Sequence, residues 1–300
     1  MRNVIISGAT SFLAVSLINR LLRAGCMIYA IVRPNSINLN RIPLNENIRI
    51  IELNISEIQK LGEFALPNID AIYHFAWEGV RGEARNNNEL QERNYKNTKR
   101  CIDECIKLKI PYFIGIGSQA EYGITDQIIT EETALEPICA YGRNKVKSYN
   151  YGMDMYRKEK FSFVWARIFS AYGPNENPNT LLMECITKMK RNETINLSPC
   201  EHMWDYTYCD DVAEALFLLL ERKVKSGAYN ISYGQARRLK EYILQLKSIM
   251  QSKSFLNFGA FSYDKRQNVQ MNPDVSKLKN ETGWAPIYDF ETGIKKMIEG

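Results

Sequence analysis

The sequence has little of the material that metal sites and histidine-based catalytic triads require. Among its 300 residues are two histidines, His74 and His202, and the seven cysteines include no Cys-x-x-Cys pair. Zinc sites draw on clustered cysteine and histidine ligands, so we expect no metal. An odd number of scattered cysteines indicates a reducing setting, and we therefore expect a cytoplasmic protein.

Long apolar runs and a strong net charge are also missing. The longest apolar run, near residues 213–220, is far shorter than the roughly 20 residues of a membrane-spanning helix, and the first residues lack a signal-peptide layout. Lysine and arginine number 39 and aspartate and glutamate 34, a net charge of +5. This charge does not require nucleic acid and suits a small anionic ligand equally well. We expect neither a nucleic acid nor a membrane as partner.

The first half of the sequence alternates between strand and helix patterns. Helical patterns at 12–24, 88–109 and 140–160 separate the apolar runs, which lie at 4–7, 27–32, 48–53, 71–76, 112–117 and 161–166. Buried apolar strands separated by helices predict an α/β fold, a doubly wound parallel sheet with helices on both faces.

The second half is less regular and predicts a smaller C-terminal cap. It has short strand patterns at 194–197 and 228–231, a helical pattern at 210–222 and a loop rich in proline and asparagine at 173–178. We expect residues 1–169 to form a dinucleotide-binding domain and residues 170–300 mainly a substrate-binding cap, with about 205–232 returning to the first domain. Open parallel sheets bind ligands at the carboxyl ends of their strands, where this cap would lie.

Two features of the first strands favour a dinucleotide. The first strand runs into Gly-Ala-Thr-Ser-Phe-Leu-Ala at residues 8–14, and a tight turn before a helix N-terminus binds pyrophosphate through backbone N–H groups. Only Gly8 of a three-glycine fingerprint is present, so a turn without a ligand is an equal alternative. The second strand ends in Arg33 rather than an acidic residue, which favours NADP over NAD unless Arg33 is a surface charge.

A Tyr-x-x-x-Lys spacing places both side chains on one helix face. The sequence has three such pairs: Tyr95/Lys99, Tyr141/Lys145 and Tyr156/Lys160. Only Tyr141 follows an apolar strand that ends in a hydroxyl residue, Ser118. Because helices beside a parallel sheet can bring these two residues together, we predict a catalytic group of Ser118, Tyr141 and Lys145.

Reduction of a ketone fits these residue types. A proton must reach the carbonyl oxygen as hydride reaches the carbon, and a phenol with its usual pKa of about 10 exchanges protons poorly at neutral pH. We expect the ammonium of Lys145 to lower the pKa of Tyr141 and to hold the nicotinamide ribose, while Ser118 orients the carbonyl. A serine hydrolase is not expected, because Ser118 lacks the Gly-x-Ser-x-Gly context.

Together and in this order, the motifs resemble those of the extended short-chain dehydrogenase/reductase family, specifically its sugar-nucleotide epimerases, dehydratases and ketoreductases. The resemblance covers nearly the whole chain and rests on these segments: the turn at 8–14, His-Phe-Ala at 74–76, Asn94, Ser118 with Tyr-Gly at 122–123, Tyr141 with Lys145, Arg-Ile-Phe-Ser-Ala-Tyr-Gly-Pro at 167–174, Asp-Tyr at 205–206, Asp-Asp-Val-Ala at 210–213 and Gly-Trp-Ala-Pro at 283–286. It implies a Rossmann-type sheet and a nicotinamide cofactor, NADP(H) by preference with NAD possible.

The resemblance also implies roles for particular residues. Its cofactor-binding positions fall on Gly8, Thr10, Ser11, Phe12, Leu13, Arg33, Asn54, Ile55, Phe75, Ala76, Asn94, Tyr141 and Lys145. Its substrate-binding positions fall on Glu78, Arg81, Ser118, Gln119, Ser170 and Arg266. For Glu78 and Arg81 a surface loop is at least as good an interpretation. Arg266 is expected at the diphosphate, because a planar guanidinium suits bidentate phosphate contact.

Departures from the family pattern narrow the expected reaction. Sugar-nucleotide 4,6-dehydratases carry an Asp-Glu pair just after the catalytic hydroxyl residue, whereas this sequence has Gln119 and Ala120. Our leading hypothesis is an NADPH-dependent reductase of a nucleotide-linked 4-keto-6-deoxy sugar, similar to the CDP-abequose and CDP-paratose synthases that serve surface-polysaccharide biosynthesis. The alternatives are an NAD-dependent sugar-nucleotide epimerase and a non-catalytic NADP-binding sensor. The family commonly forms homodimers through a four-helix bundle, for which 88–109 and 140–160 are the candidate helices.

Overall fold

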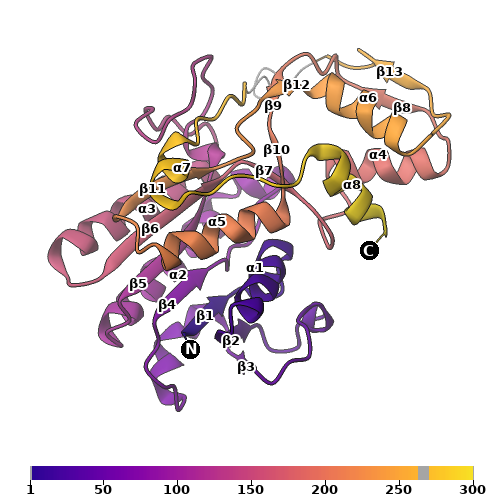
Figure 1. The fold of residues 1–300 in the computed structure, drawn as a ribbon. Helices are drawn as coiled ribbons and strands as arrows, with labels where there is room; N and C mark the ends of the chain where they lie inside the picture. Colours follow the sequence, from indigo (N-terminus) through magenta and orange to yellow (C-terminus); the bar gives the residue numbers. More distant parts are fainter. Residues whose placement is uncertain (1, 263–269, 300) are drawn as a thin grey trace.

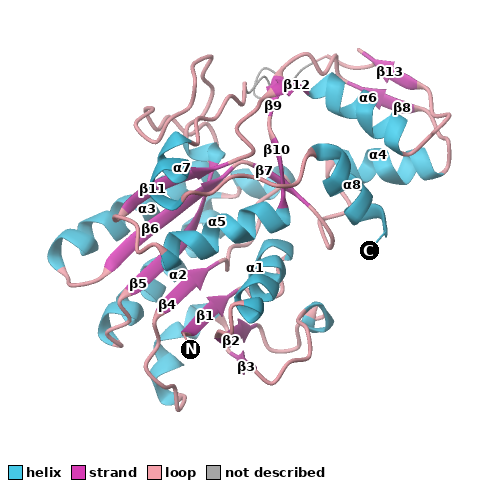
Figure 2. Ribbon diagram, viewed as in Figure 1, coloured by secondary structure: helices cyan, strands magenta, loops and turns pink. Residues whose placement is uncertain are grey.

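A computed structural model describes residues 2–262 and 270–299, and its centre is a parallel sheet of seven strands in the order β11-β6-β5-β4-β1-β2-β3 (Figures 1 and 2). The strands are β1 (Asn3–Ser7), β2 (Met27–Val32), β3 (Ile48–Glu52), β4 (Ala71–His74), β5 (Tyr112–Ser118), β6 (Ser162–Ile168) and β11 (Gly227–Ile231). The strand order reverses between β1 and β4, which is the switch point where such sheets bind ligands. The predicted α/β fold is confirmed.

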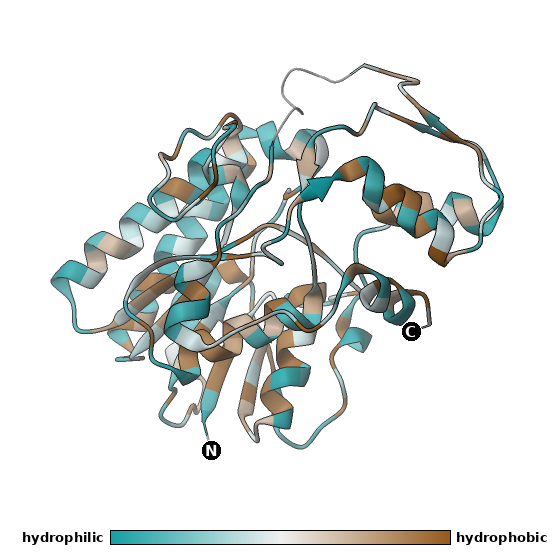
Figure 3. Ribbon diagram, turned by 45° about the horizontal axis from the view of Figure 1, so that its top comes forward, coloured by the Kyte–Doolittle hydropathy of each residue, from teal (hydrophilic) through white to brown (hydrophobic). Residues whose placement is uncertain are grey.

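Helices cover both faces of this sheet (Figure 2). They are α1 (Phe12–Arg23), α2 (Asn88–Lys107), α3 (Ala140–Lys158), α5 (Cys209–Glu221) and α7 (Ser276–Thr282). Alternate side chains of β1 serve different faces, since Val4 lies in a core with Leu17 of α1, whereas Ile5 lies in a core with Cys101 of α2. In Figure 3 apolar residues gather in the layers around the sheet, and the outer helices carry more hydrophilic ones.

A smaller layer lies beyond the carboxyl ends of the strands (Figure 1). Its elements are β7 (Ser170–Tyr172), α4 (Leu181–Lys190), β8 (Ile195–Leu197), β9 (Met203–Trp204), β10 (Tyr206–Tyr208), β12 (Arg237–Arg238), α6 (Leu239–Ile249), β13 (Leu256–Phe258) and α8 (Phe290–Glu299). The aromatic core of this layer contains Tyr172, Tyr242 and Phe290, and Phe12 at the start of α1 packs against it. The start of α1 therefore lies where the two layers meet, and a division at residue 169 stays a prediction.

Among the described residues, no helix combines the length and the apolar character needed to cross a membrane.

Candidate active site

The turn between β1 and α1 is narrow and capped. Gly8 has a φ of +67°, and a Cβ on it would lie 2.7 Å from the backbone nitrogen of Ala76. Ser11 is the N-cap of α1, and its hydroxyl accepts a hydrogen bond from the N–H of Ala14 at 3.4 Å. Phe12 and Leu13 are the first residues of α1. No carbonyl of a preceding helical turn can therefore accept a hydrogen bond from their N–H groups. The turn therefore fits the diphosphate of a dinucleotide.

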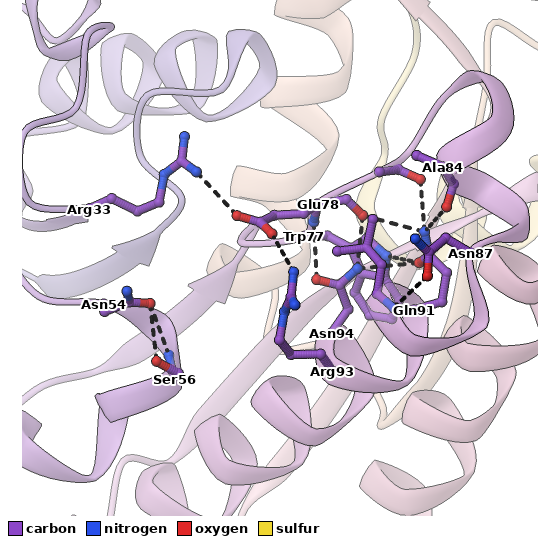
Figure 4. Close-up of polar contacts among 12 residues, drawn as sticks. Arg33, Asn54, Ser56, Trp77, Glu78, Ala84, Asn87, Gln91, Arg93 and Asn94 are labelled. Atoms are coloured by element: carbon purple, nitrogen blue, oxygen red, sulfur yellow. Dashed lines mark hydrogen bonds and ion pairs between the residues drawn. The ribbon is translucent and has the colours of Figure 1, made fainter.

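Side chains expected at the adenosine end of a dinucleotide lie at the ends of neighbouring strands (Figure 4). Arg33 follows β2, and its Nη1 donates to Oε1 of Glu78 at 3.1 Å. The other carboxylate oxygen of Glu78 accepts from Nη2 of Arg93, on α2, at 3.2 Å. Asn54 follows β3 and caps the 3₁₀ helix η2 (Ile55–Glu63). The structure thus joins Glu78, which we expected to bind substrate, to the predicted cofactor residue Arg33.

Two buried amides on α2 hold the loop that follows β4. The Oδ1 of Asn94 accepts from the N–H of Glu78 at 3.1 Å, and its Nδ2 donates to the carbonyl of Glu78 at 2.8 Å. The amide of Gln91 donates to the carbonyl of Gly79 at 2.8 Å and accepts from the Trp77 indole N–H at 2.8 Å. Asn94, predicted to bind cofactor, here fixes the protein's own loop. Phe75 and Ala76 precede that loop.

The structure brings the predicted catalytic hydroxyls together. Ser118 is the last residue of β5 and Tyr141 lies in the first turn of α3, and the Ser118 hydroxyl is near enough to the Tyr141 phenol to act on its pKa. Gly142 permits this close approach, because a Cβ on it would lie 2.3 Å from the carbonyl oxygen of Ala120. Both hydroxyl residues are buried, with exposed fractions of 8% for Ser118 and 7% for Tyr141.

Lys145 follows Tyr141 by one helical turn and is almost fully enclosed. Its Nζ donates to the carbonyl of Ile116 at 2.6 Å and lies 3.6 Å from the centre of the Trp77 ring. The same nitrogen is 5.7 Å from the centre of the Tyr141 ring. Burial lowers the pKa of Lys145 to about 7, and the carboxylate of Glu121 acts in the opposite direction.

The phenol of Tyr141 departs from our expectation. Burial raises the pKa of Tyr141 to about 12, while the hydrogen bond with Ser118 and the positive charge of Arg85 act to lower it. The guanidinium carbon of Arg85 lies 5.0 Å from the centre of the Tyr141 ring. We expected Lys145 to lower this pKa below 10, and the net direction is the opposite because removal from water outweighs the nearby charges. The result is a neutral phenol, the form that can donate a proton.

A buried ion pair supports the end of β5. The guanidinium of Arg167 donates to Glu121 at 2.8 Å, and the exposed fractions of the two side chains are 1% and 0%. Glu121 also accepts from the N–H of Ser118 at 2.8 Å and from the indole of Trp165 at 2.9 Å. Sequence reasoning missed Glu121, although the Ser-x-x-Glu spacing from Ser118 is that of a capping box, which the structure contains.

The other two Tyr-x-x-x-Lys pairs have different surroundings. Lys99 pairs with Asp103 at 3.4 Å, and its Nζ lies 4.7 Å from the ring of Tyr151. Lys160 lies beyond the end of α3 at Lys158, so it does not share a helix face with its tyrosine. Trp77 and Arg85, which contact the Tyr141 and Lys145 pair, carried no motif that would have revealed them.

Two of the predicted substrate residues, Arg81 and Ser170, contact segments from the second half of the chain. Arg81 donates to Glu176 at 3.2 Å, and the Glu176 side chain has an exposed fraction of 5%. Ser170 begins β7, and its hydroxyl lies 3.6 Å from the sulfur of Met271. Gln119 is half-buried directly after Ser118. Arg266 lies outside the described residues.

The fold and the glycine turn are those of dinucleotide-binding α/β proteins. The model of the NAD dependent epimerase/dehydratase family matches residues 4–232, and the chain belongs to this family. The resemblance seen in the sequence is confirmed, and the protein is an enzyme of the family.

Individual relatives have related activities. The chain is 27% identical to CDP-abequose synthase of Salmonella muenchen over 307 residues, which cover 99% of this chain and 97% of that protein. It is 25% identical to the trifunctional UDP-glucose 4,6-dehydratase/UDP-4-keto-6-deoxy-D-glucose 3,5-epimerase/UDP-4-keto-L-rhamnose-reductase RHM1 of Arabidopsis thaliana over 99% of this chain, and spans 46% of that protein. A Bacillus cereus UDP-glucuronic acid 4-epimerase, solved with UDP-glucuronic acid and NAD, matches with a TM-score of 0.86 and 21% identity over 99% of this chain and 98% of that chain.

Proposed function

We propose that the enzyme is an NADPH-dependent reductase of a nucleotide-linked 4-keto-6-deoxy sugar, with hydride delivered to C4 and Tyr141 as proton donor. The observation that carries the proposal is the juxtaposition of Ser118, at the end of β5, with Tyr141 in the first turn of α3 and Lys145 one turn further on. This group lies at the carboxyl end of β5, and only β4 separates β5 from β1, which leads into the turn at 8–14.

Each residue of the group has a role in this reaction. Tyr141 donates its proton to the carbonyl oxygen, and Ser118 holds that oxygen by a hydrogen bond. Lys145 in its ammonium form stabilises the phenolate left behind and holds the nicotinamide ribose. The cofactor would be held by the turn at 8–14 and by Arg33, and when bound it supplies the hydride.

Two observations support the substrate class: the residues that the site has in place of a dehydratase acid and base, and the similarity to one relative. Gln119 and Ala120 offer no acid or base for eliminating water, which supports reduction over dehydration. The similarity to CDP-abequose synthase over nearly the full length of both chains supports a nucleotide-linked deoxysugar and a role in polysaccharide biosynthesis. Seven free, buried cysteines support a cytoplasmic location. Arg81, Ser170 and Arg266 are proposed substrate contacts, and a homodimer through α2 and α3 stays a prediction.

A second candidate is an NAD-dependent sugar-nucleotide epimerase, which one observation favours. Glu78 places a carboxylate beside Arg33, and a carboxylate at this edge can accept hydrogen bonds from the ribose hydroxyls of NAD. A single-turnover experiment with added NADPH separates the candidates. The reductase consumes NADPH and releases NADP in proportion to sugar reduced, whereas a purified protein that carries NAD and needs none added would contradict the reductase.

The role of Tyr141 is tested by Tyr141→Phe, with Tyr156→Phe on the same helix as the matched control. We expect Tyr141→Phe to lower kcat by roughly 10²–10⁴-fold, the range of general acid catalysis, while NADPH affinity hardly changes. The control should keep normal turnover, because Tyr156 is 41% exposed on the outer part of α3. Unchanged turnover in Tyr141→Phe would show that another group donates the proton.

A further inference from the structure

Two arginines from separate elements converge on a single carboxylate at the edge of the sheet (Figure 4). Arg33 follows β2 and Arg93 lies on α2, and each donates to a different oxygen of Glu78, at 3.1 Å and 3.2 Å. The three side chains have exposed fractions of 65% for Arg33, 59% for Arg93 and 50% for Glu78. Both guanidiniums are therefore open to solvent and to a ligand.

Arg33 and Glu78 both lie close in the fold to the turn at 8–14, which would bind the diphosphate of a dinucleotide. The backbone of Ala76 closes the turn at Gly8, and Glu78 follows Ala76 by two residues. Arg33 lies directly after β2, whose residues 27–31 pair with β1. In sheets of this kind the ribose next to adenine lies over the end of the second strand. Arg33, and Arg93 through the carboxylate that the two share, therefore lie at the strand end where the ribose next to adenine would be held.

The bridge can open without disturbing the loop. The backbone of Glu78 is fixed by both hydrogen bonds of Asn94, so only the carboxylate arm has to turn away. Exposed ion pairs of this kind contribute roughly 0–1 kcal/mol each. A phosphate dianion offers more charge and three oxygens to two planar guanidiniums, which makes it a stronger partner than one carboxylate.

We propose that Arg33 and Arg93 together bind the 2′-phosphate of an NADP-type cofactor, and that Glu78 is an internal competitor which occupies both arginines until that phosphate displaces it. The proposal deepens and rests on the NADPH dependence proposed above. It adds Arg93 as a specificity-determining residue and gives Glu78 a role toward the cofactor instead of the sugar.

The test is direct titration of the full-length protein with adenosine 2′,5′-bisphosphate and with 5′-AMP, which differ by the 2′-phosphate alone. We expect Arg93→Ala to weaken the bisphosphate by about 10-fold or more, the size of a lost charge-assisted hydrogen bond, and to leave 5′-AMP unchanged. Glu78→Gln should tighten the bisphosphate several-fold, because the competing charge is gone. The matched control is Arg157→Ala, since Arg157 is 66% exposed and pairs with Asp154 at 2.9 Å on α3.

Other results would overturn the inference. If Arg93→Ala binds both ligands with the same affinity as Arg157→Ala, Arg93 does not belong to the 2′-phosphate site. If Glu78→Gln lowers the affinity for 5′-AMP and leaves the affinity for the bisphosphate unchanged, Glu78 is an acceptor for ribose hydroxyls and not a competitor of the phosphate. Circular dichroism of each variant identifies any that fails to fold. If Arg93→Ala fails to fold, Arg93→Lys replaces it: because it keeps the charge, it should retain part of the preference for the bisphosphate. No sugar is present in these titrations. A negative result would therefore contradict the 2′-phosphate site alone, whereas the reductase activity is tested separately by Tyr141→Phe.

Discussion

At the scale of single residues, burial disfavours the charged forms of both Tyr141 and Lys145, the proposed catalytic pair. It raises the pKa of Tyr141 to about 12 and lowers that of Lys145 to about 7. The charge that acts against burial on Lys145 is the carboxylate of Glu121. His74 stays neutral there, since burial lowers its pKa to about 3. The phenol of Tyr141, the proposed proton donor, is therefore protonated at neutral pH, and the ammonium of Lys145 is the group that titrates there.

This arrangement predicts how reduction depends on pH. Lys145 is protonated below its pKa of about 7 and neutral above it, so kcat should fall as pH rises through this value. Lys145→Arg should be slower at every pH but should lose this fall, because a guanidinium keeps its charge across the range. The measurement is the pH profile of kcat for both proteins under saturating substrates. A flat profile in the unmodified enzyme would contradict the role of the ammonium.

Residue spacing revealed part of this site and not the rest. The Tyr141 and Lys145 pair could be predicted because a spacing of four residues places both side chains on one helix face, and because the preceding strand pattern ends in Ser118. The pKa directions were not accessible, because they depend on how deeply each group is buried. Trp77 was missed for a related reason: its contact with Lys145 joins segments that no local pattern connects.

At the scale of elements, the site depends on how closely α3 approaches the end of β5. Gly142 lies against the backbone of Ala120, so the first turn of α3 reaches the residue pair that follows Ser118. Gly152, two to three turns further along α3, lies against the ring of Phe163 in the same close manner. The helix therefore contacts the sheet layer tightly at two places, and only the first belongs to the proposed active site.

Gly142→Ala should damage the site selectively. A Cβ at this position would lie 2.3 Å from the carbonyl oxygen of Ala120, so α3 has to move away from Ser118. We expect a fall in kcat of about 10-fold or more, since misplaced catalytic groups lose rate steeply, with NADPH affinity preserved. Gly152→Ala is the control: it should lower thermal stability without this loss of turnover. Equal effects of both variants on kcat would show that Gly142 has no special relation to the hydroxyl pair.

Element prediction was best where periodicity extends over many residues. The helical patterns at 88–109 and 140–160 correspond to α2 and α3, whose ends lie two residues earlier. The cap was described less completely, because strands of two or three residues have no measurable period. β12 pairs with β9 across more than thirty residues of chain, and only the folded structure shows such a partner.

At the scale of the whole molecule, the chain returns from the cap to the sheet layer before its last helix. Asp211 on α5 accepts hydrogen bonds from the N–H groups of Ile287 at 2.9 Å and Tyr288 at 3.1 Å. The indole of Trp284 donates to the carbonyl of Asp211 at 3.0 Å. The segment fixed in this way leads directly into α8, whose Phe290 lies in the cap core. One buried carboxylate therefore connects the packing of the two layers.

Asp211→Ala should weaken this connection and lower the free energy of unfolding by roughly 2–4 kcal/mol, because two hydrogen bonds to a buried carboxylate are lost. Asp210→Ala is the matched control. Asp210 is the neighbouring, half-buried residue in the first turn of α5, and a carboxylate at this position contributes only about 0.3–1 kcal/mol through the helix dipole. Urea unfolding followed by circular dichroism measures both variants against the unmodified protein. If Asp211→Ala unfolds at the same urea concentration as Asp210→Ala, the attachment of α8 does not depend on this carboxylate, and the cap is held to the sheet by its aromatic core alone.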